Sequence, residues 1–75
     1  MAAGATGHLR EVLATHLRRR RAELGLSQEA LGLEAGLHRT FIGAVKRSET
    51  NISLDNLERL AMALKIDAWQ LLKPL

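Results

Sequence analysis

The chain has 75 residues, enough for one domain near the lower size limit for folding on a single hydrophobic core. It has no cysteine, which excludes disulfides and thiolate metal sites, and its eleven Lys and Arg against eight Asp and Glu give a net charge of +3, which favours an anionic partner. Fifteen leucines, with one Phe, one Trp, no Tyr and few β-branched residues, favour helices, so we expect an all-α domain.

The first residues, MAAGATG, lack the basic segment and apolar run of a secretion signal. No apolar stretch is long enough to span a membrane, so no membrane contact is expected. We expect residues 1–7 to be a flexible segment and residues 8–75 to form the domain.

A first helix is predicted from Thr6 or Gly7 to about Leu24, with Gly25 ending it. Its apolar stripe comprises Leu9, Leu13 and Leu17. The four arginines at 18–21 are spread around most of this helix, so they cannot all face one ligand and should be mostly solvated.

Two short helices joined by a tight turn are predicted between Ser27 and Arg47. Ser27 is a good N-cap for the first of them, and Gly36 can end it in a left-handed conformation. Gly32 allows the two helices to cross closely, because it carries almost no side chain. The predicted buried positions are Leu31, Ala35, Phe41, Ile42 and Val45. The open side of the second helix carries His38, Arg39, Thr40, Gly43, Ala44 and Arg47. This is the helix-turn-helix layout, which enters a DNA groove.

The polar stretch SETNIS links this pair to a fourth helix, which Ser53 is expected to cap. The apolar positions of the fourth helix are Leu54, Leu57, Leu60, Ala61 and Leu64. A last short helix is predicted from Ala68 to Lys73, capped by Asp67 with Gln70 in a capping box, and Pro74 should stop it. The chain should therefore contain five helices.

The segment from about Leu17 to Leu72 resembles the Xre/Cro-type helix-turn-helix DNA-binding family of phage repressors, Cro proteins and bacterial regulators. The pieces LRRRRAELGLSQEAL, AGLHRTFIGAV and NISLDNLERLAMAL follow the family's order and spacing. Within the family, the chain looks most like the small dimeric controller proteins of restriction-modification systems. The resemblance implies a compact five-helix bundle of the phage-repressor (lambda-repressor-like) type.

Side chains near the start of the second helix of the pair can reach base edges in the major groove. Arg39 can donate two parallel hydrogen bonds to guanine O6 and N7. Thr40 can offer its hydroxyl group to a base or its methyl group to thymine, and Ala44, one turn on, can make a methyl contact. We expect these three residues to read bases; the alternative is that Arg39 is only an exposed arginine.

Contacts to DNA phosphates are expected around this surface. Gln28 opens a helix, where its amide and the free backbone N–H groups can hold a phosphate, and the family resemblance implies the same role. His38 either offers its backbone N–H to a phosphate or acts only as a helix cap. The predicted phosphate-binding residues are Gln28, His38, Phe41, Lys46, Arg47, Thr50, Asn51 and Ser53.

Several positions in this region depart from the pattern of the resembled family. Lys46 stands where relatives commonly have a glutamate that pairs with Arg21, so Arg21 must use Glu49, solvent or phosphate. Ser48 stands where relatives often have glycine, and Thr50 where they often have a basic residue. Phe41 also replaces a tyrosine that is frequent in relatives and so lacks a hydroxyl contact. The departures at Ser48, Thr50 and Phe41 favour weaker DNA binding, which Lys46 partly offsets by its charge.

Enzymatic chemistry finds no support in the sequence. His8, His16 and His38 form no metal-ligand spacing with a carboxylate pair, and no glycine-rich phosphate loop follows a strand. We expect no catalytic residue, no metal, no cofactor and no small-molecule ligand.

The C-terminal end carries more apolar side chains than one small core should need. As an interface between two copies of the chain we predict Ile66, Trp69, Leu72 and Leu75. The alternative is that these residues are ordinary core packing of the last helix.

Together these features predict a sequence-specific regulator of transcription that binds double-stranded DNA as a homodimer, on an operator with two inverted half-sites. It should be bacterial, cytoplasmic and associated with the nucleoid, and a controller of a restriction-modification system fits best. The alternatives are an antitoxin or phage-type repressor, or a helical protein-interaction module that has lost specific DNA binding.

Overall fold

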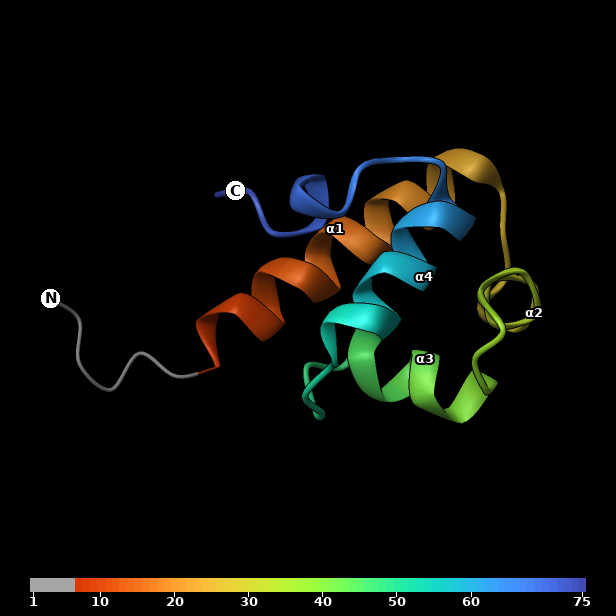
Figure 1. The fold of residues 1–75 in the computed structure, drawn as a ribbon, viewed down its shortest axis with the longest axis horizontal. Coiled ribbons are helices and arrows are strands. Elements are labelled where there is room, and N and C mark those ends of the chain that lie inside the picture. Colours follow the sequence, from red (N-terminus) through yellow and green to blue (C-terminus); the bar gives the residue numbers. More distant parts are fainter. Residues whose placement is uncertain (1–6) are drawn as a thin grey trace, which may run out of the picture.

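The structure, a computed structural model, describes residues 7–75. Within them the chain forms α1 (His8–Leu24), α2 (Gln28–Ala35), α3 (Arg39–Lys46), α4 (Leu54–Leu64) and a 3₁₀ turn, η1 (Ala68–Leu71) (Figure 1). This part of the chain contains no strand, which confirms the all-α prediction. The predicted flexible segment 1–7 lies outside the described residues, except for Gly7, which directly precedes α1.

The first helix ends where the sequence predicted. Gly25 takes the left-handed conformation, with φ +68°, and its N–H donates to the Ala22 carbonyl oxygen at 3.1 Å. Leu13 and Leu17 are buried as expected, but the prediction for Leu9 is wrong, because its side chain is exposed. The first turn of α1 lies at the end of the molecule away from α2, where little of the bundle can cover it (Figure 1).

The pair α2 and α3 forms by local signals that the sequence carries. Ser27 caps α2, with its Oγ accepting a hydrogen bond from the Ala30 N–H at 2.9 Å, and Gly36 follows α2 with φ +70°. At Gly32 the chain passes so close to the turn that an added Cβ would lie 2.6 Å from the Leu37 carbonyl oxygen. The predicted close crossing at Gly32 is therefore confirmed.

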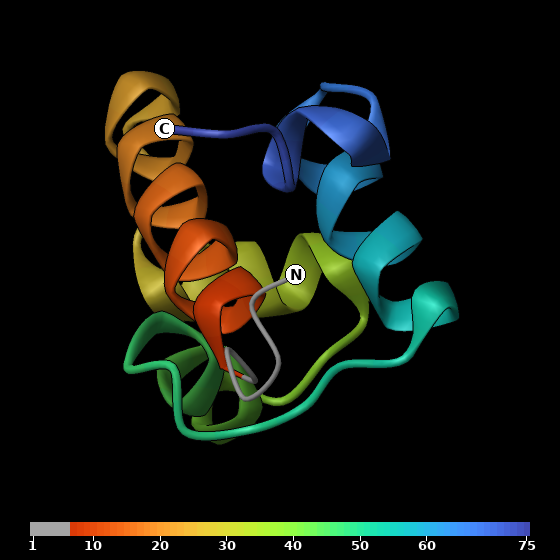
Figure 2. The ribbon, with the colours of Figure 1, turned by 90° about the vertical axis from the view of Figure 1, so that its left-hand side faces the viewer.

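The polar linker brings the chain from α3 to α4. Figure 2 shows residues 47–53 passing along the same end of the molecule as α3 before α4 begins. Ser53 caps α4 as predicted, with its Oγ accepting from the Asn56 N–H at 3.1 Å. After Leu64 the chain leaves α4 through Lys65, whose φ is +59°.

The predicted fifth helix is wrong, because Ala68–Leu71 form a single 3₁₀ turn. Its backbone hydrogen bonds join residues three apart, as in the Gln70 N–H that donates to the Asp67 carbonyl at 3.0 Å. Pro74 has no N–H to donate and disfavours a helical conformation at Lys73, so no α-helix extends to that residue. The described residues therefore contain four α-helices and one 3₁₀ turn.

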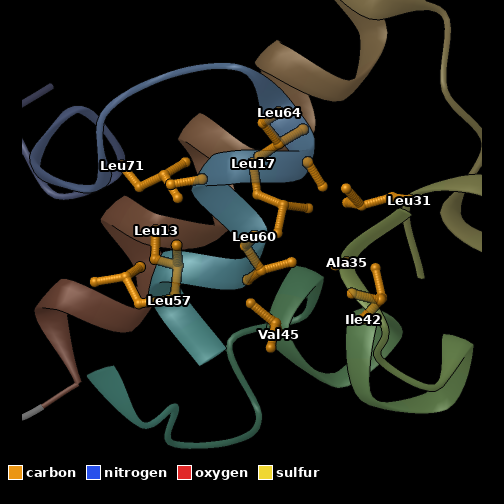
Figure 3. Close-up of a cluster of buried hydrophobic side chains, with 12 residues drawn as sticks. Leu13, Leu17, Leu31, Ala35, Ile42, Val45, Leu57, Leu60, Leu64 and Leu71 are labelled. Carbon is orange, nitrogen blue, oxygen red and sulfur yellow. The ribbon is translucent and has the colours of Figure 1, made fainter. Parts of the chain in front are cut away.

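The hydrophobic core lies between the four helices, and η1 closes one side of it (Figure 3). Its buried members are Leu13, Leu17, Leu31, Ala35, Ile42, Val45, Leu57, Leu60, Ala61, Ala63, Leu64 and Leu71. Among the residues described, no polar or charged side chain is buried. None of the helices in residues 7–75 is both long and apolar enough to cross a bilayer.

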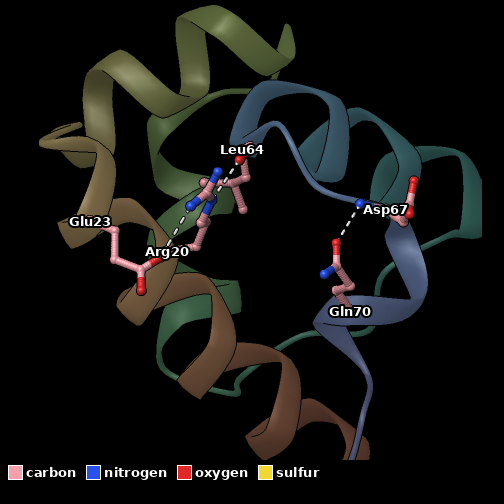
Figure 4. A network of polar contacts seen from close by, with 5 residues as sticks. All are labelled: Arg20, Glu23, Leu64, Asp67 and Gln70. Atoms are coloured by element: carbon pink, nitrogen blue, oxygen red, sulfur yellow. Dashed lines mark hydrogen bonds and ion pairs between the residues drawn. The ribbon is translucent and has the colours of Figure 1, made fainter.

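A polar contact ties α1 to the end of α4 (Figure 4). Arg20 donates from Nε to the Leu64 carbonyl oxygen at 2.9 Å, and its Nη1 lies 3.2 Å from Glu23 Oε1. The Leu64 carbonyl is one of the last of α4, where no N–H of the same helix is available. Nearby, Gln70 Oε1 accepts from the Asp67 N–H at 2.9 Å, as the sequence predicted.

Candidate nucleic-acid interface

The exposed side of α3 carries the residues that the sequence predicts to meet DNA. Arg39 and Thr40, in its first turn, are exposed, and Ala44 is half-buried. The predicted buried side is largely confirmed: Ile42 and Val45 are buried, and Phe41 is half-buried against the core. The three residues expected to read bases thus lie in the first two turns of α3.

Gly43 departs from this division, because it is buried although the sequence placed it on the open side. Two polar side chains cover it: a Cβ at this position would lie 2.9 Å from Gln28 Nε2 and 3.0 Å from Arg47 Nη1. Both of these groups are predicted to bind phosphate. Because Gly43 has no side chain, the Gln28 amide and the Arg47 guanidinium can both lie over the middle of α3.

Gln28 joins the first turn of α2 to the first turn of α3. Its Nε2 donates to the Arg39 carbonyl oxygen at 3.1 Å. The first backbone N–H groups of α2 have no partner within the helix, and that of Ala30 is used by the Ser27 cap. The side-chain contact to Arg39 was not predicted, because it depends on how the two helices cross.

The Arg39 guanidinium group also forms an ion pair with a residue of α2. Its Nη1 lies 3.7 Å from Glu29 Oε2, and the two side chains are 67% and 68% exposed. Glu29 was not predicted from the sequence to belong to this surface. The only available signal was an acidic residue beside Gln28, and that signal does not identify Arg39 as its partner.

The other predicted phosphate-binding residues lie at the two ends of α3 and on the linker. His38 caps α3, its Nδ1 accepting from the Thr40 N–H at 3.0 Å. Arg47 is exposed, and its Nε lies 2.9 Å from Glu49 Oε1. Thr50 donates from Oγ1 to the Asn51 carbonyl at 3.2 Å. Ser53 caps α4 and Lys46 is half-buried.

The arginine run is less solvated than expected. Arg18 and Arg19 are exposed, but Arg20 and Arg21 are half-buried. The expected partners of Arg21 are not those observed, since its Nη1 donates to the Leu26 carbonyl at 2.9 Å. Its Nε is buried without a hydrogen-bond partner. Arg18 Nη1 in turn donates to the carbonyl of Lys46, the last residue of α3, at 2.9 Å.

The apolar residues at the C-terminal end do not all share one environment. Trp69 and Leu75 are 62% and 65% exposed, whereas Ile66 and Leu72 are half-buried and pack against the core. The residue of η1 that fills the core is Leu71, which the sequence reasoning did not single out. Only part of the predicted interface is therefore available at the surface of a single chain.

The histidines take structural positions. His16 Nε2 lies 2.8 Å from the Lys73 carbonyl oxygen, which links α1 to the C-terminal end. His8 is exposed at the start of α1. Within residues 7–75, no group of three His, Cys, Asp or Glu side chains is placed to hold a metal ion.

Comparison with known proteins identifies relatives of the whole domain. The model of the HTH_3 helix-turn-helix family matches residues 17–68. A hypothetical transcription factor of Neisseria meningitidis is 48% identical over 66 residues, which cover 88% of this chain and 62% of that protein. The present chain thus spans less than two-thirds of that relative's length.

Two controller proteins are also similar to this chain. Control protein C.SmaI of Serratia marcescens is 45% identical over 64 residues, which cover 85% of this chain and 76% of the relative. The crystal structure of the restriction-modification controller protein C.AhdI from Aeromonas hydrophila superposes with a TM-score of 0.80 at 40% identity, covering 83% of this chain and 94% of that one.

Proposed function

The chain belongs to the helix-turn-helix family of DNA-binding transcription regulators, and we propose that it acts as a homodimer on an operator with two inverted half-sites, as the controller of a restriction-modification system. The similarity to C.SmaI and C.AhdI supports the controller role. The family is not an enzyme class. A regulator of this kind acts in the bacterial cytoplasm, on the DNA of the nucleoid.

The observation that carries this proposal is the position of Arg39. It lies exposed in the first turn of α3, next to exposed Thr40, while its backbone is bonded to Gln28 on α2. An arginine presented in this way can pair with guanine O6 and N7 in the major groove. Thr40 and Ala44 then lie along the same groove, as further base-reading positions.

Phosphate contacts would hold α3 in register without reading sequence. Gln28 and Arg47 both lie over Gly43. The linker, which passes along the same end of the molecule as α3 (Figure 2), carries Thr50 and Asn51. The residues that we assign to phosphate binding are Gln28, His38, Phe41, Lys46, Arg47, Thr50, Asn51 and Ser53.

The short length of α3 supports binding by two copies. Its eight residues span roughly 12 Å, so one helix can contact only a few base pairs. Regulators of this type reach useful specificity by placing two recognition helices in successive major grooves, about 34 Å apart. The exposed Trp69 and Leu75 give a surface on which two copies can meet.

Arg39→Ala tests the proposed base reading. We expect it to lose about 1–3 kcal/mol of discrimination at one base pair, while its binding to unrelated DNA changes little. Arg47→Ala is the matched control, since it also removes an exposed arginine near α3 that is paired with a glutamate. Arg47→Ala should weaken binding to all sequences by a similar factor. A uniform loss in Arg39→Ala would contradict base reading, and no effect in either variant would point to a protein-interaction module.

A further inference from the structure

Two neighbouring residues of α2 hold Arg39 at both of its ends. Gln28 Nε2 donates to the Arg39 backbone carbonyl at 3.1 Å, and Glu29 Oε2 lies 3.7 Å from the Arg39 guanidinium. The first turns of α2 and α3 therefore meet at Arg39. A side chain proposed to read a base is thus already engaged by a carboxylate of the same molecule.

The ion pair between Glu29 and Arg39 does not act chiefly on folding. Both side chains are about two-thirds exposed, and exposed ion pairs add little to stability because water and salt screen them. Neither residue contributes to the buried core. A carboxylate next to a DNA-contacting arginine has a larger effect on binding, since DNA presents phosphates to the same guanidinium.

We propose that Glu29 is a positioning residue that sets sequence specificity by holding the Arg39 guanidinium toward the base edges and away from the phosphates; this inference rests on the proposed base reading by Arg39. A guanidinium has five N–H donors in a fixed plane. Two of them pair with guanine O6 and N7, and a donor on the remaining edge stays available for the Glu29 carboxylate. The pair with Glu29 is therefore compatible with the specific complex.

On DNA that lacks the guanine, the same pair acts against binding. Arg39 could then gain affinity only by turning to a phosphate, and Glu29 competes with that phosphate for the guanidinium. Glu29 thus weakens binding to non-cognate sites more than binding to the cognate site, which is specificity by an unfavourable interaction with the wrong partner.

A second arginine and glutamate pair on the same surface provides a comparison. Arg47 Nε lies 2.9 Å from Glu49 Oε1, but Arg47 is assigned to phosphate, which every DNA sequence presents. Removing the charge of Glu49 should therefore strengthen binding to all DNA alike. Removing the charge of Glu29 should strengthen binding only where the guanine is absent.

The experiment compares Glu29→Gln with Glu49→Gln, each of which removes one negative charge close to α3. Affinity is measured at one salt concentration for the duplex preferred by the wild-type protein and for a scrambled duplex of equal length. We expect Glu29→Gln to strengthen binding to the scrambled duplex roughly two- to fivefold and to leave the preferred duplex unchanged, so that the specificity ratio falls by that factor. Glu49→Gln should leave the ratio unchanged.

An equal gain on both duplexes in Glu29→Gln, as in Glu49→Gln, would overturn the proposal, because Glu29 would then act only through net charge. An unchanged ratio and unchanged affinities would overturn it as well. In an Arg39→Ala background, Glu29→Gln should no longer alter the ratio, since the two residues act through one contact. The thermal unfolding midpoint of each variant, expected to match the wild-type protein, shows that the fold is retained.

A failure of the role proposed for Glu29 can be distinguished from a failure of the proposed DNA-binding function. If the wild-type protein prefers no DNA sequence, or if Arg39→Ala keeps full preference, the base-reading role itself fails. If Arg39→Ala loses preference and Glu29→Gln does not, the base reading stands and only the role of Glu29 is overturned.

Discussion

Gly32 is the residue on which the geometry of the two motif helices depends most. Its own carbonyl accepts the Leu37 N–H at 2.8 Å, and a Cβ on it would meet the Leu37 carbonyl oxygen at 2.6 Å. The obstructing atom belongs to the backbone of the turn, so it cannot move without moving α3. The placement of Arg39, which we propose to read a base, therefore depends on the absence of a side chain at Gly32.

Gly32→Ala tests this at the level of stability. Alanine is intrinsically the better helix former by about 1 kcal/mol, yet the clash with Leu37 should dominate and lower the free energy of unfolding by about 1–3 kcal/mol. Urea denaturation measures the change. Leu33→Ala, at the neighbouring position where the side chain is 81% exposed, should change stability by less than about 0.5 kcal/mol. A Gly32→Ala variant as stable as the wild-type protein would show that the turn can give way.

Among the elements, the helix ends and the close crossing at Gly32 could be predicted from the sequence, whereas the polar contacts between elements could not. Ser27, Ser53, Gly25 and Gly36 were all predicted correctly, because a cap depends on residues within one turn of it. The last element was predicted as an α-helix and is a 3₁₀ turn. Its capping signals are present, but the segment before the proline is too short to continue.

Within the candidate site, the same distinction holds. The exposure of Arg39 and Thr40 followed from the helical period of α3. The burial of Gly43 and the pairing of Arg39 with Glu29 did not, because both depend on the crossing of α2 over α3. Arg20 is a further case, since its bond to the end of α4 joins residues far apart in the chain.

At the scale of the whole molecule, one surface is proposed for DNA and another for a second copy. The DNA surface comprises the exposed side of α3 and the linker of residues 47–53 beside it (Figure 2). The proposed dimer surface is centred on Trp69 and Leu75, which remain largely exposed in the single chain. Pairing there would cover apolar area that one small core leaves open, with aromatic and aliphatic side chains at its centre.

Trp69→Ala tests the proposed dimer surface. Because Trp69 is mostly exposed, its removal should leave the fold intact and shift the sedimentation equilibrium toward the monomer. Leu33→Ala removes a similarly exposed apolar side chain from α2 and should leave the association unchanged. An undiminished dimer in Trp69→Ala would place the interface elsewhere on the molecule.

We propose that two copies of this chain read one operator, and selection of bound duplexes from a random DNA pool at near-physiological salt tests this claim. We predict enrichment of two inverted half-sites at a fixed spacing, with their centres about 34 Å or a multiple of that distance apart. Binding without an enriched motif, or binding that disappears with a modest increase in salt, would contradict the claim, because contacts to phosphates alone would then account for it.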